Sequence, residues 1–114
     1  MYFSPWMEQR RNLRLKEDLP LHYELSSGIK YGDTLTQDIS EGGTRIVLDN
    51  FIPRLSRIAL KIKLTPNKLI EVNGEVKWAQ RFSHSYRYQT GVEFKNIGID
   101  IRRMIQKLIG EHSL

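Results

Sequence analysis

Apolar and polar residues alternate along four separate stretches of the chain. The alternation is clearest in residues 57–64 (RIALKIKL), where apolar residues stand at every second position and two lysines lie between them. A period of two is typical of a β-strand with one buried and one exposed face. Residues 19–25, 69–78 and 86–94 show the same pattern. We therefore expect an antiparallel sheet with one face on the core.

Two shorter strands, around residues 30–37 and 44–48, complete the predicted set. Between the strands lie turn-forming runs such as SSG, SEGG and TPNK. Six short strands with such breaks favour a small closed or nearly closed barrel, since closure removes exposed strand edges. The fold class predicted is all-β, a six-stranded antiparallel barrel with a C-terminal helix.

One tryptophan and one glycine in the stretch 69–78 carry specific expectations. Trp78 shares the register of the apolar positions of that stretch, so it is predicted to pack in the core rather than to stack on a ligand. Gly74 also stands on the inward register, where a missing side chain favours a bend or bulge.

The two ends of the chain differ from the middle. Apolar residues recur every three or four positions after residue 98, which predicts a helix over about 98–112 that begins near Asp100. Such a helix either covers one barrel opening or serves as a contact surface, and covering its own domain is the favoured role. Residues 1–18 show neither period, so we expect a flexible N-terminal arm and a barrel domain over residues 19–114.

Composition narrows the function classes. The chain of 114 residues carries 18 basic and 13 acidic residues, a net charge of +5 that favours anionic partners. It has no cysteine, which suits a reducing cytoplasm and excludes disulfides and thiolate chemistry. No apolar run is long enough to span a membrane. We therefore expect a cytoplasmic protein.

The chain lacks the usual signatures of catalysis. Its three histidines are His22, His84 and His112, and they have no carboxylate or cysteine at ligand spacing, so no metal site is predicted. It contains no phosphate-binding glycine loop and no nucleophile elbow. An enzyme is disfavoured, and no cofactor is expected.

Arginines in the N-terminal arm are candidates for anion binding. Arg10 and Arg14 would lie about 6 Å apart along a helix, or about 13 Å apart in an extended chain. In either case both side chains can reach one ligand. A guanidinium is permanently charged and pairs through its planar fork with phosphate oxygens or a guanine edge. The alternative is a solvated arm whose arginines pair with Glu8, Glu17 or Asp18.

A second candidate segment is DISEGG, residues 38–43. The Asp38 carboxylate can accept hydrogen bonds from a guanine edge, the Ser40 hydroxyl can donate or accept one, and Gly43 lets the backbone approach a ligand. The alternative is an Asx-type turn in which Gly42 or Gly43 takes a positive φ. Each segment alone favours the structural alternative.

Together, the two segments resemble the paired signature of the PilZ domain, the bacterial receptor module for cyclic di-GMP. The family pattern is R-x-x-x-R followed by [D/N]-x-S-x-x-G, and RRNLR (10–14) and DISEGG (38–43) match it without departure. The resemblance continues through GEVKWA (74–79) and TGVEF (90–94) into the terminal helix. The matching positions are Arg10, Arg14, Asp38, Ser40 and Gly43.

The resemblance implies a non-catalytic cyclic di-GMP receptor. The arginines of the arm, with Arg11 assisting, would contact guanine edges and phosphates, while Asp38 and Ser40 would orient a guanine. Ligand binding would fold the arm over the barrel and transmit a conformational change to a protein partner. No nucleic acid is expected as a partner under this interpretation.

Two other functions stay open at this point. A small basic β-barrel with aromatic side chains can bind single-stranded nucleic acid. A PilZ-like interaction module without a ligand is the second alternative, although the intact signature disfavours it.

Overall fold

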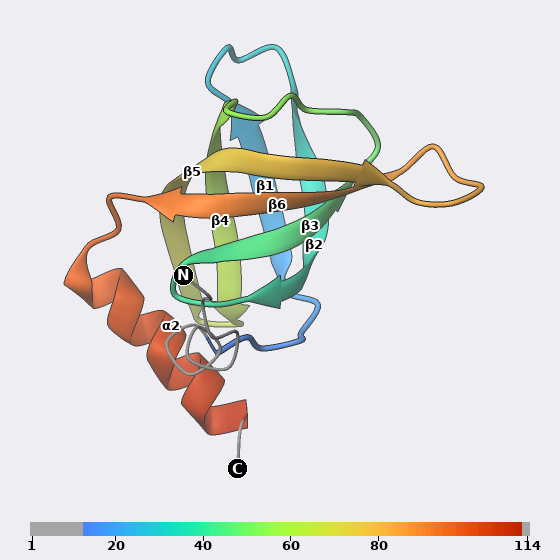
Figure 1. The fold of residues 1–114 in the computed structure, drawn as a ribbon. Helices are drawn as coiled ribbons and strands as arrows, with labels where there is room; N and C mark the ends of the chain where they lie inside the picture. Colours follow the sequence, from blue (N-terminus) through green and yellow to red (C-terminus); the bar gives the residue numbers. More distant parts are fainter. Residues whose placement is uncertain (1–12, 113–114) are drawn as a thin grey trace, which may run out of the picture.

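The computed structural model describes residues 13–112, which form a closed barrel of six antiparallel strands and one helix (Figure 1). This confirms the predicted fold class. Around the barrel the strands follow the order β1-β2-β3-β6-β5-β4. Their bounds are β1 Pro20–Leu25, β2 Tyr31–Ile39, β3 Gly43–Leu48, β4 Arg57–Thr65, β5 Lys68–Arg81 and β6 Tyr88–Lys95, followed by the helix α2 Ile99–His112.

The alternation in the sequence becomes the inside and the outside of the barrel. In β4 every second side chain is buried, from Ile58 to Leu64, while those between face solvent. Strands β1 and β5 flank β4 and pair with it residue by residue, Leu60 opposite both Tyr23 and Val72. Apolar side chains from all six strands therefore meet in one core.

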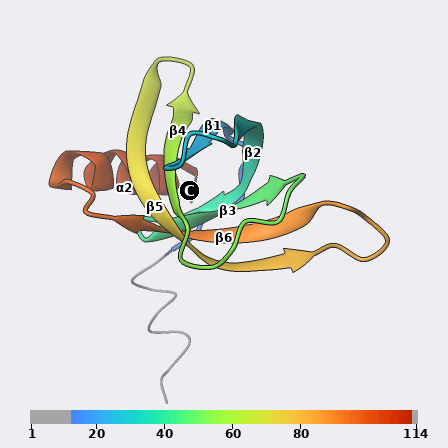
Figure 2. The same ribbon diagram turned by 90° about the horizontal axis from the view of Figure 1, so that it is seen from above.

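The helix α2 lies beside one end of the barrel (Figures 1 and 2). Its buried residues Ile105, Leu108 and Ile109 belong to the same core cluster as the strands. The predicted helix at about 98–112 and its packing on its own domain are confirmed. Over residues 13–112, no helix is long and apolar enough to cross a membrane.

The segment before β1 is tied to the end of β2. The backbone N–H of Leu15 donates to the Ile39 carbonyl at 2.8 Å, and the Ile39 N–H returns a bond to Leu15 at 3.0 Å. The Thr36 hydroxyl donates to the Glu17 carbonyl at 2.6 Å. Residues 13–18 thus lie along the barrel in this structure, whereas residues 1–12 fall outside the described part and the arm boundary stays a prediction.

The prediction that Trp78 packs in the core is wrong. The register between β5 and β6 shifts between Val76 and Trp78, which places Trp78 opposite Gly91. One extra residue in a strand reverses which side the following side chains face. Val76 is fully buried, but Trp78 is 39% exposed on the outer face.

Two further expectations for these strands need correction. The irregularity predicted at Gly74 occurs instead after Val76, and Gly74 allows close packing, because a Cβ there would lie 2.5 Å from Val92 Cγ1. Tyr86 was placed in the last strand, yet β6 begins at Tyr88 and Tyr86 is 73% exposed in the preceding turn.

The docking of residues 13–18 can be tested with two leucines that are two positions apart. Leu15 is buried in the core cluster and Leu13 is 56% exposed. We expect Leu15→Ala to lower the free energy of unfolding by about 2 kcal/mol or more, because it removes buried methyl groups and leaves a cavity. Leu13→Ala should change it by less than about 0.5 kcal/mol. Urea unfolding of both variants checks this, and equal effects would show that the segment is not part of the core.

Candidate functional site

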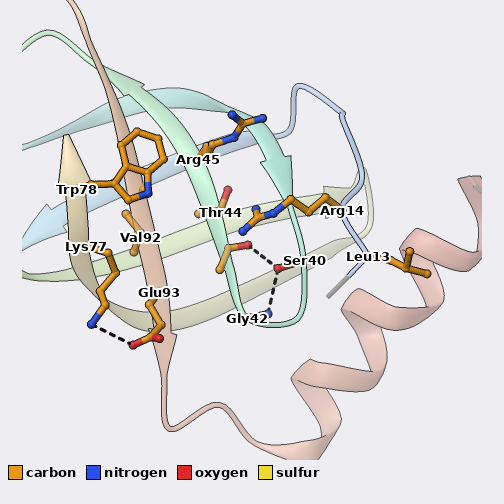
Figure 3. Close-up of a pocket in the computed structure, with 12 residues that line it drawn as sticks. Leu13, Arg14, Ser40, Gly42, Thr44, Arg45, Lys77, Trp78, Val92 and Glu93 are labelled. Carbon is orange, nitrogen blue, oxygen red and sulfur yellow. Dashed lines mark hydrogen bonds and ion pairs between the residues drawn. The ribbon is translucent and has the colours of Figure 1, made fainter. Parts of the chain in front are cut away.

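An open cavity of about 830 Å³ lies against β3, β5 and β6, beside the turn that joins β2 to β3. Figure 3 shows Trp78 and Lys77 on one side of it and Arg14 on the other, with Arg45 close by. The remaining lining comes from Leu13, the β2–β3 turn, the start of β3 and the facing part of β6. The cavity therefore joins residues that are far apart in the sequence.

Two arginines share one buried carboxylate at the edge of this cavity. Arg14 Nη1 lies 2.7 Å from Asp38 Oδ1, and Arg45 Nε lies 2.5 Å from Asp38 Oδ2. The Asp38 side chain is 1% exposed, whereas Arg14 and Arg45 are 45% and 36% exposed. Each guanidinium has five N–H donors, so both keep donors for a ligand while Asp38 fixes their positions. Two positive charges against one negative charge leave this corner cationic.

The β2–β3 turn is held by the hydroxyl and backbone of Ser40. The Ser40 N–H donates to the Gly43 carbonyl at 2.8 Å, and the Gly42 N–H donates to Ser40 Oγ at 3.1 Å. Thr44 closes the turn through its hydroxyl, which donates to the Asp38 carbonyl at 2.6 Å. The alternative of a turn closed by the Asp38 side chain is wrong, because that carboxylate is bonded to arginines.

Gly43 is required by close packing rather than by an unusual φ. Of the glycines in residues 13–112, only Gly28 has a positive φ. A Cβ at Gly43 would collide with the backbone carbonyl of Val92 on β6. The missing side chain therefore lets β3 and β6 approach each other at the cavity wall.

Trp78 forms an aromatic wall of the cavity. The indole lies over Gly91, where a Cβ would collide with it. An exposed indole face beside arginines suits a planar ring system, on which it can stack.

Glu93, which lines the cavity, forms ion pairs with two lysines. Lys95 Nζ lies 2.6 Å from Glu93 Oε1 and Lys77 Nζ lies 3.6 Å from it. The hydrogen bond from Lys95 lowers the pKa of the Glu93 carboxyl below its ordinary value; burial opposes this shift and the charge of Lys77 adds to it. The same hydrogen bond raises the pKa of Lys95. Glu93 therefore stays ionised with its charge compensated.

The structure brings four of the six predicted site residues together at the cavity edge. Ser40 and Gly43 line the cavity with Arg14, and Asp38 lies behind it, joined to Arg14. Arg10 and Arg11 lie outside the described residues. No group of three metal-ligating side chains occurs within residues 13–112.

Sequence reasoning did not single out Arg45 and Lys77, which line the cavity, and it weighed Trp78 as a stacking residue but assigned it to the core. Arg45 and Lys77 look like ordinary exposed strand positions. The signal that could have exposed Trp78 is the pairing of a tryptophan with a glycine across two strands, which needs the shifted register to be known.

Comparisons with known proteins give one family and several similar structures. The family model described as PilZ domain matches residues 8–111. The Bacillus subtilis inhibitor of motility (MotI/DgrA) is 20% identical with a TM-score of 0.76, over 90% of this chain and 51% of that chain. The PilZ domain with c-di-GMP of YcgR from Escherichia coli is 15% identical with a TM-score of 0.70, over 90% of both chains.

A third similar structure is the K. pneumonia MrkH–c-di-GMP complex, which is 22% identical with a TM-score of 0.73, over 90% of this chain and 52% of that chain. The present chain thus spans about half the length of the MotI and MrkH chains. A comparison with curated proteins found no match.

The role of Gly43 predicts opposite effects for two alanine substitutions. Gly43→Ala should lower the free energy of unfolding by about 1–3 kcal/mol, because the new methyl group forces β3 away from Val92. Gly110→Ala has open space around its Cβ and should raise stability by up to about 1 kcal/mol, since alanine favours a helix. Chemical unfolding measures both, and a neutral Gly43→Ala would contradict the close approach.

Proposed function

The chain belongs to the PilZ domain family, and from this premise we propose that it is a non-catalytic receptor for cyclic di-GMP. The observation that carries the proposal is the ion pair between Arg14 and Asp38, which joins the two halves of the family signature beside a cavity. Two of the similar structures, those of YcgR and MrkH, are described as containing c-di-GMP. Both are bound forms of proteins with the same fold.

The chemistry of the cavity suits the ligand. Cyclic di-GMP presents two phosphates and two guanines. The guanidiniums of Arg14 and Arg45 offer permanent charge and paired donors for phosphate oxygens or a guanine edge. Trp78 offers an aromatic face for a base. A volume of about 830 Å³ falls within the range of small-molecule sites.

Asp38 is proposed to position the arginines rather than to read a guanine directly. Both of its carboxylate oxygens already accept hydrogen bonds from Arg14 and Arg45, and the side chain is buried. A guanine could reach Asp38 only by displacing one arginine. The Ser40 hydroxyl is likewise engaged by the turn, so the backbone of the turn, which lines the cavity at Ser40, Gly42 and Gly43, is the part proposed to approach the ligand.

Arg10 and Arg11 extend the proposed site from the arm. Arg14 is anchored to Asp38, and Leu13 and Arg14 both line the cavity. Charged contacts to the ligand must exceed an ordering cost of about 1–2 kcal/mol per residue fixed. Ordering of the arm over the barrel is the proposed conformational change that a protein partner senses.

The proposal predicts a severe loss of ligand affinity when Arg14 is removed. Arg14→Ala should weaken cyclic di-GMP binding by at least about 2 kcal/mol, roughly thirtyfold in Kd, because a charged contact is lost and Asp38 loses one partner. Arg103→Ala, which removes an exposed arginine on α2, should leave the Kd unchanged. Isothermal titration calorimetry on both variants measures the difference.

Two results would remove this assignment. One is wild-type protein that does not bind cyclic di-GMP, and the other is Arg14→Ala with unchanged affinity. Titration with single-stranded oligonucleotides at several salt concentrations tests the nucleic-acid alternative, since such binding weakens steeply as salt rises.

Stacking of Trp78 on a base is tested separately. Trp78→Leu keeps an apolar cover over Gly91 but removes the ring, and we expect a loss of about 1–3 kcal/mol in binding free energy. Phe82→Leu is the matched control. Phe82 directly follows β5, the strand that carries Trp78, but it does not line the cavity. Calorimetric Kd values that do not differ between the two variants would remove Trp78 from the site and leave the arginine contacts standing.

A further inference from the structure

Two loops start from the same edge of the barrel, beyond the ends of β3 and β5; one turns back toward β4 and the other projects away from the barrel (Figures 1 and 2). They are residues 49–56, between β3 and β4, and residues 82–87, between β5 and β6. Asp49 Oδ1 lies 3.3 Å from Arg87 Nε, and the rings of Phe51 and Tyr88 meet edge to face with centroids 5.7 Å apart. The two loops therefore contact each other where β3 ends and β6 begins.

This surface exposes four large apolar side chains. Phe51 and Leu55 on the first loop are 51% and 56% exposed, and Phe82 and Tyr86 on the second are 37% and 73% exposed. We call these four residues the two-loop surface. Leu55 lies beside Val76, six residues before Phe82 along β5, or about 20 Å of extended chain. The exposed apolar side chains are therefore spread over an extended surface, and several such side chains on one surface indicate an interaction site.

The most informative feature of this surface is the backbone conformation of Leu55. Its φ is 74°, a left-handed conformation that leucine rarely adopts. Two backbone hydrogen bonds hold this conformation. The Leu55 N–H donates to the Val76 carbonyl at 2.7 Å, and the Val76 N–H donates to the Ser56 carbonyl at 2.9 Å. Glycine would fit this backbone without strain, yet the sequence places there a leucine whose side chain faces solvent. His84 at the tip of the other loop also has a positive φ, 58°.

Strained backbone that persists tends to mark functional positions. The cost of holding Leu55 in this conformation is not recovered by burial of its side chain within the domain. A partner that covers the side chain supplies that burial. The position of Leu55 therefore indicates a contact with another molecule.

The charge around these loops indicates the kind of molecule. Residues 49–57 and 81–88 contain four arginines and a single carboxylate, that of Asp49. Asp49 is already paired with Arg87. Among residues 13–112, neither Arg54 nor Arg81 has an ion-pair partner, and both are exposed. The rim of the surface is therefore cationic.

We propose that the two-loop surface docks an acidic segment of a partner protein whose apolar side chains cover Leu55 and Phe82. The arginines of the rim pair with the carboxylates of that segment, an arrangement that gives orientation and specificity. The aliphatic side chain of Leu55 favours a protein over a nucleic acid, because leucine neither stacks on bases nor binds phosphate. This proposal does not rest on cyclic di-GMP.

The test starts with selection from a displayed library of random peptides, with the whole chain as the target. Fluorescence anisotropy then measures the affinity of the chain for the tightest-binding peptide. We expect the selected peptides to combine Asp or Glu with Leu, Ile or Phe. Leu55→Ser and Arg81→Glu should each weaken binding of that peptide by about tenfold or more. Leu69→Ser is the matched control, since Leu69 is also 56% exposed but lies in β5 away from these loops. It should leave binding unchanged.

Leu55→Gly separates docking from folding. Glycine relieves the left-handed strain, so the thermal midpoint should stay equal or rise while peptide binding falls as in Leu55→Ser. A lowered midpoint would instead assign Leu55 a structural role and overturn the proposal.

Other outcomes also overturn it. They are the absence of any enriched peptide, enrichment of basic or uncharged peptides, and equal loss of binding in Leu69→Ser. Binding to phosphatidylglycerol vesicles or RNA oligonucleotides without peptide binding would assign the surface to a different partner class. Self-association that disappears in Leu55→Ser, measured by sedimentation, would make the partner a second copy of the chain.

Discussion

The buried Asp38 carboxylate, shared by Arg14 and Arg45, is the interaction on which the rest of the site depends. An unpaired carboxylate with 1% of its side chain exposed would be strongly destabilising, so burial at this position requires both arginines. Arg14 comes from the segment before β1 and Arg45 from β3. One charge therefore joins the entering chain to the barrel and places two cations at the cavity edge.

Much of the fold could be predicted because the barrel follows the alternation of the sequence. The stretch 57–64 became β4, residues 57–65, and the helix expected at about 98–112 begins at Ile99. These elements are regular, so a period of two or of 3.6 describes them. Asp38, Ser40 and Gly43 were predicted as site residues only because their motif, paired with RRNLR upstream, matches the family signature.

The residues that sequence reasoning missed depend on contacts between distant strands. Trp78 has the spacing of a core residue, and only the register shift beside it moves the indole to the outside. In the sequence, Arg45 looks like an ordinary solvated strand residue. Its role depends on its pairing partner on β2, the buried carboxylate of Asp38. Gly43 was predicted to let the backbone approach a ligand, but the constraint that the structure shows is the carbonyl of Val92 on another strand. None of these facts is local.

The register shift in β5 also explains why the cavity and the two-loop surface are neighbours. Before the shift, Val76 faces the core; after it, Ala79 pairs with the buried Thr90 and Trp78 faces outward. Bulges increase strand twist and re-aim side chains, and they are common at barrel rims. Here the strand past the bulge leaves the barrel wall as the hairpin that carries Phe82. The same backbone irregularity thus presents an aromatic wall to the cavity, and the N–H of Leu55 binds the carbonyl of Val76, where the irregularity begins.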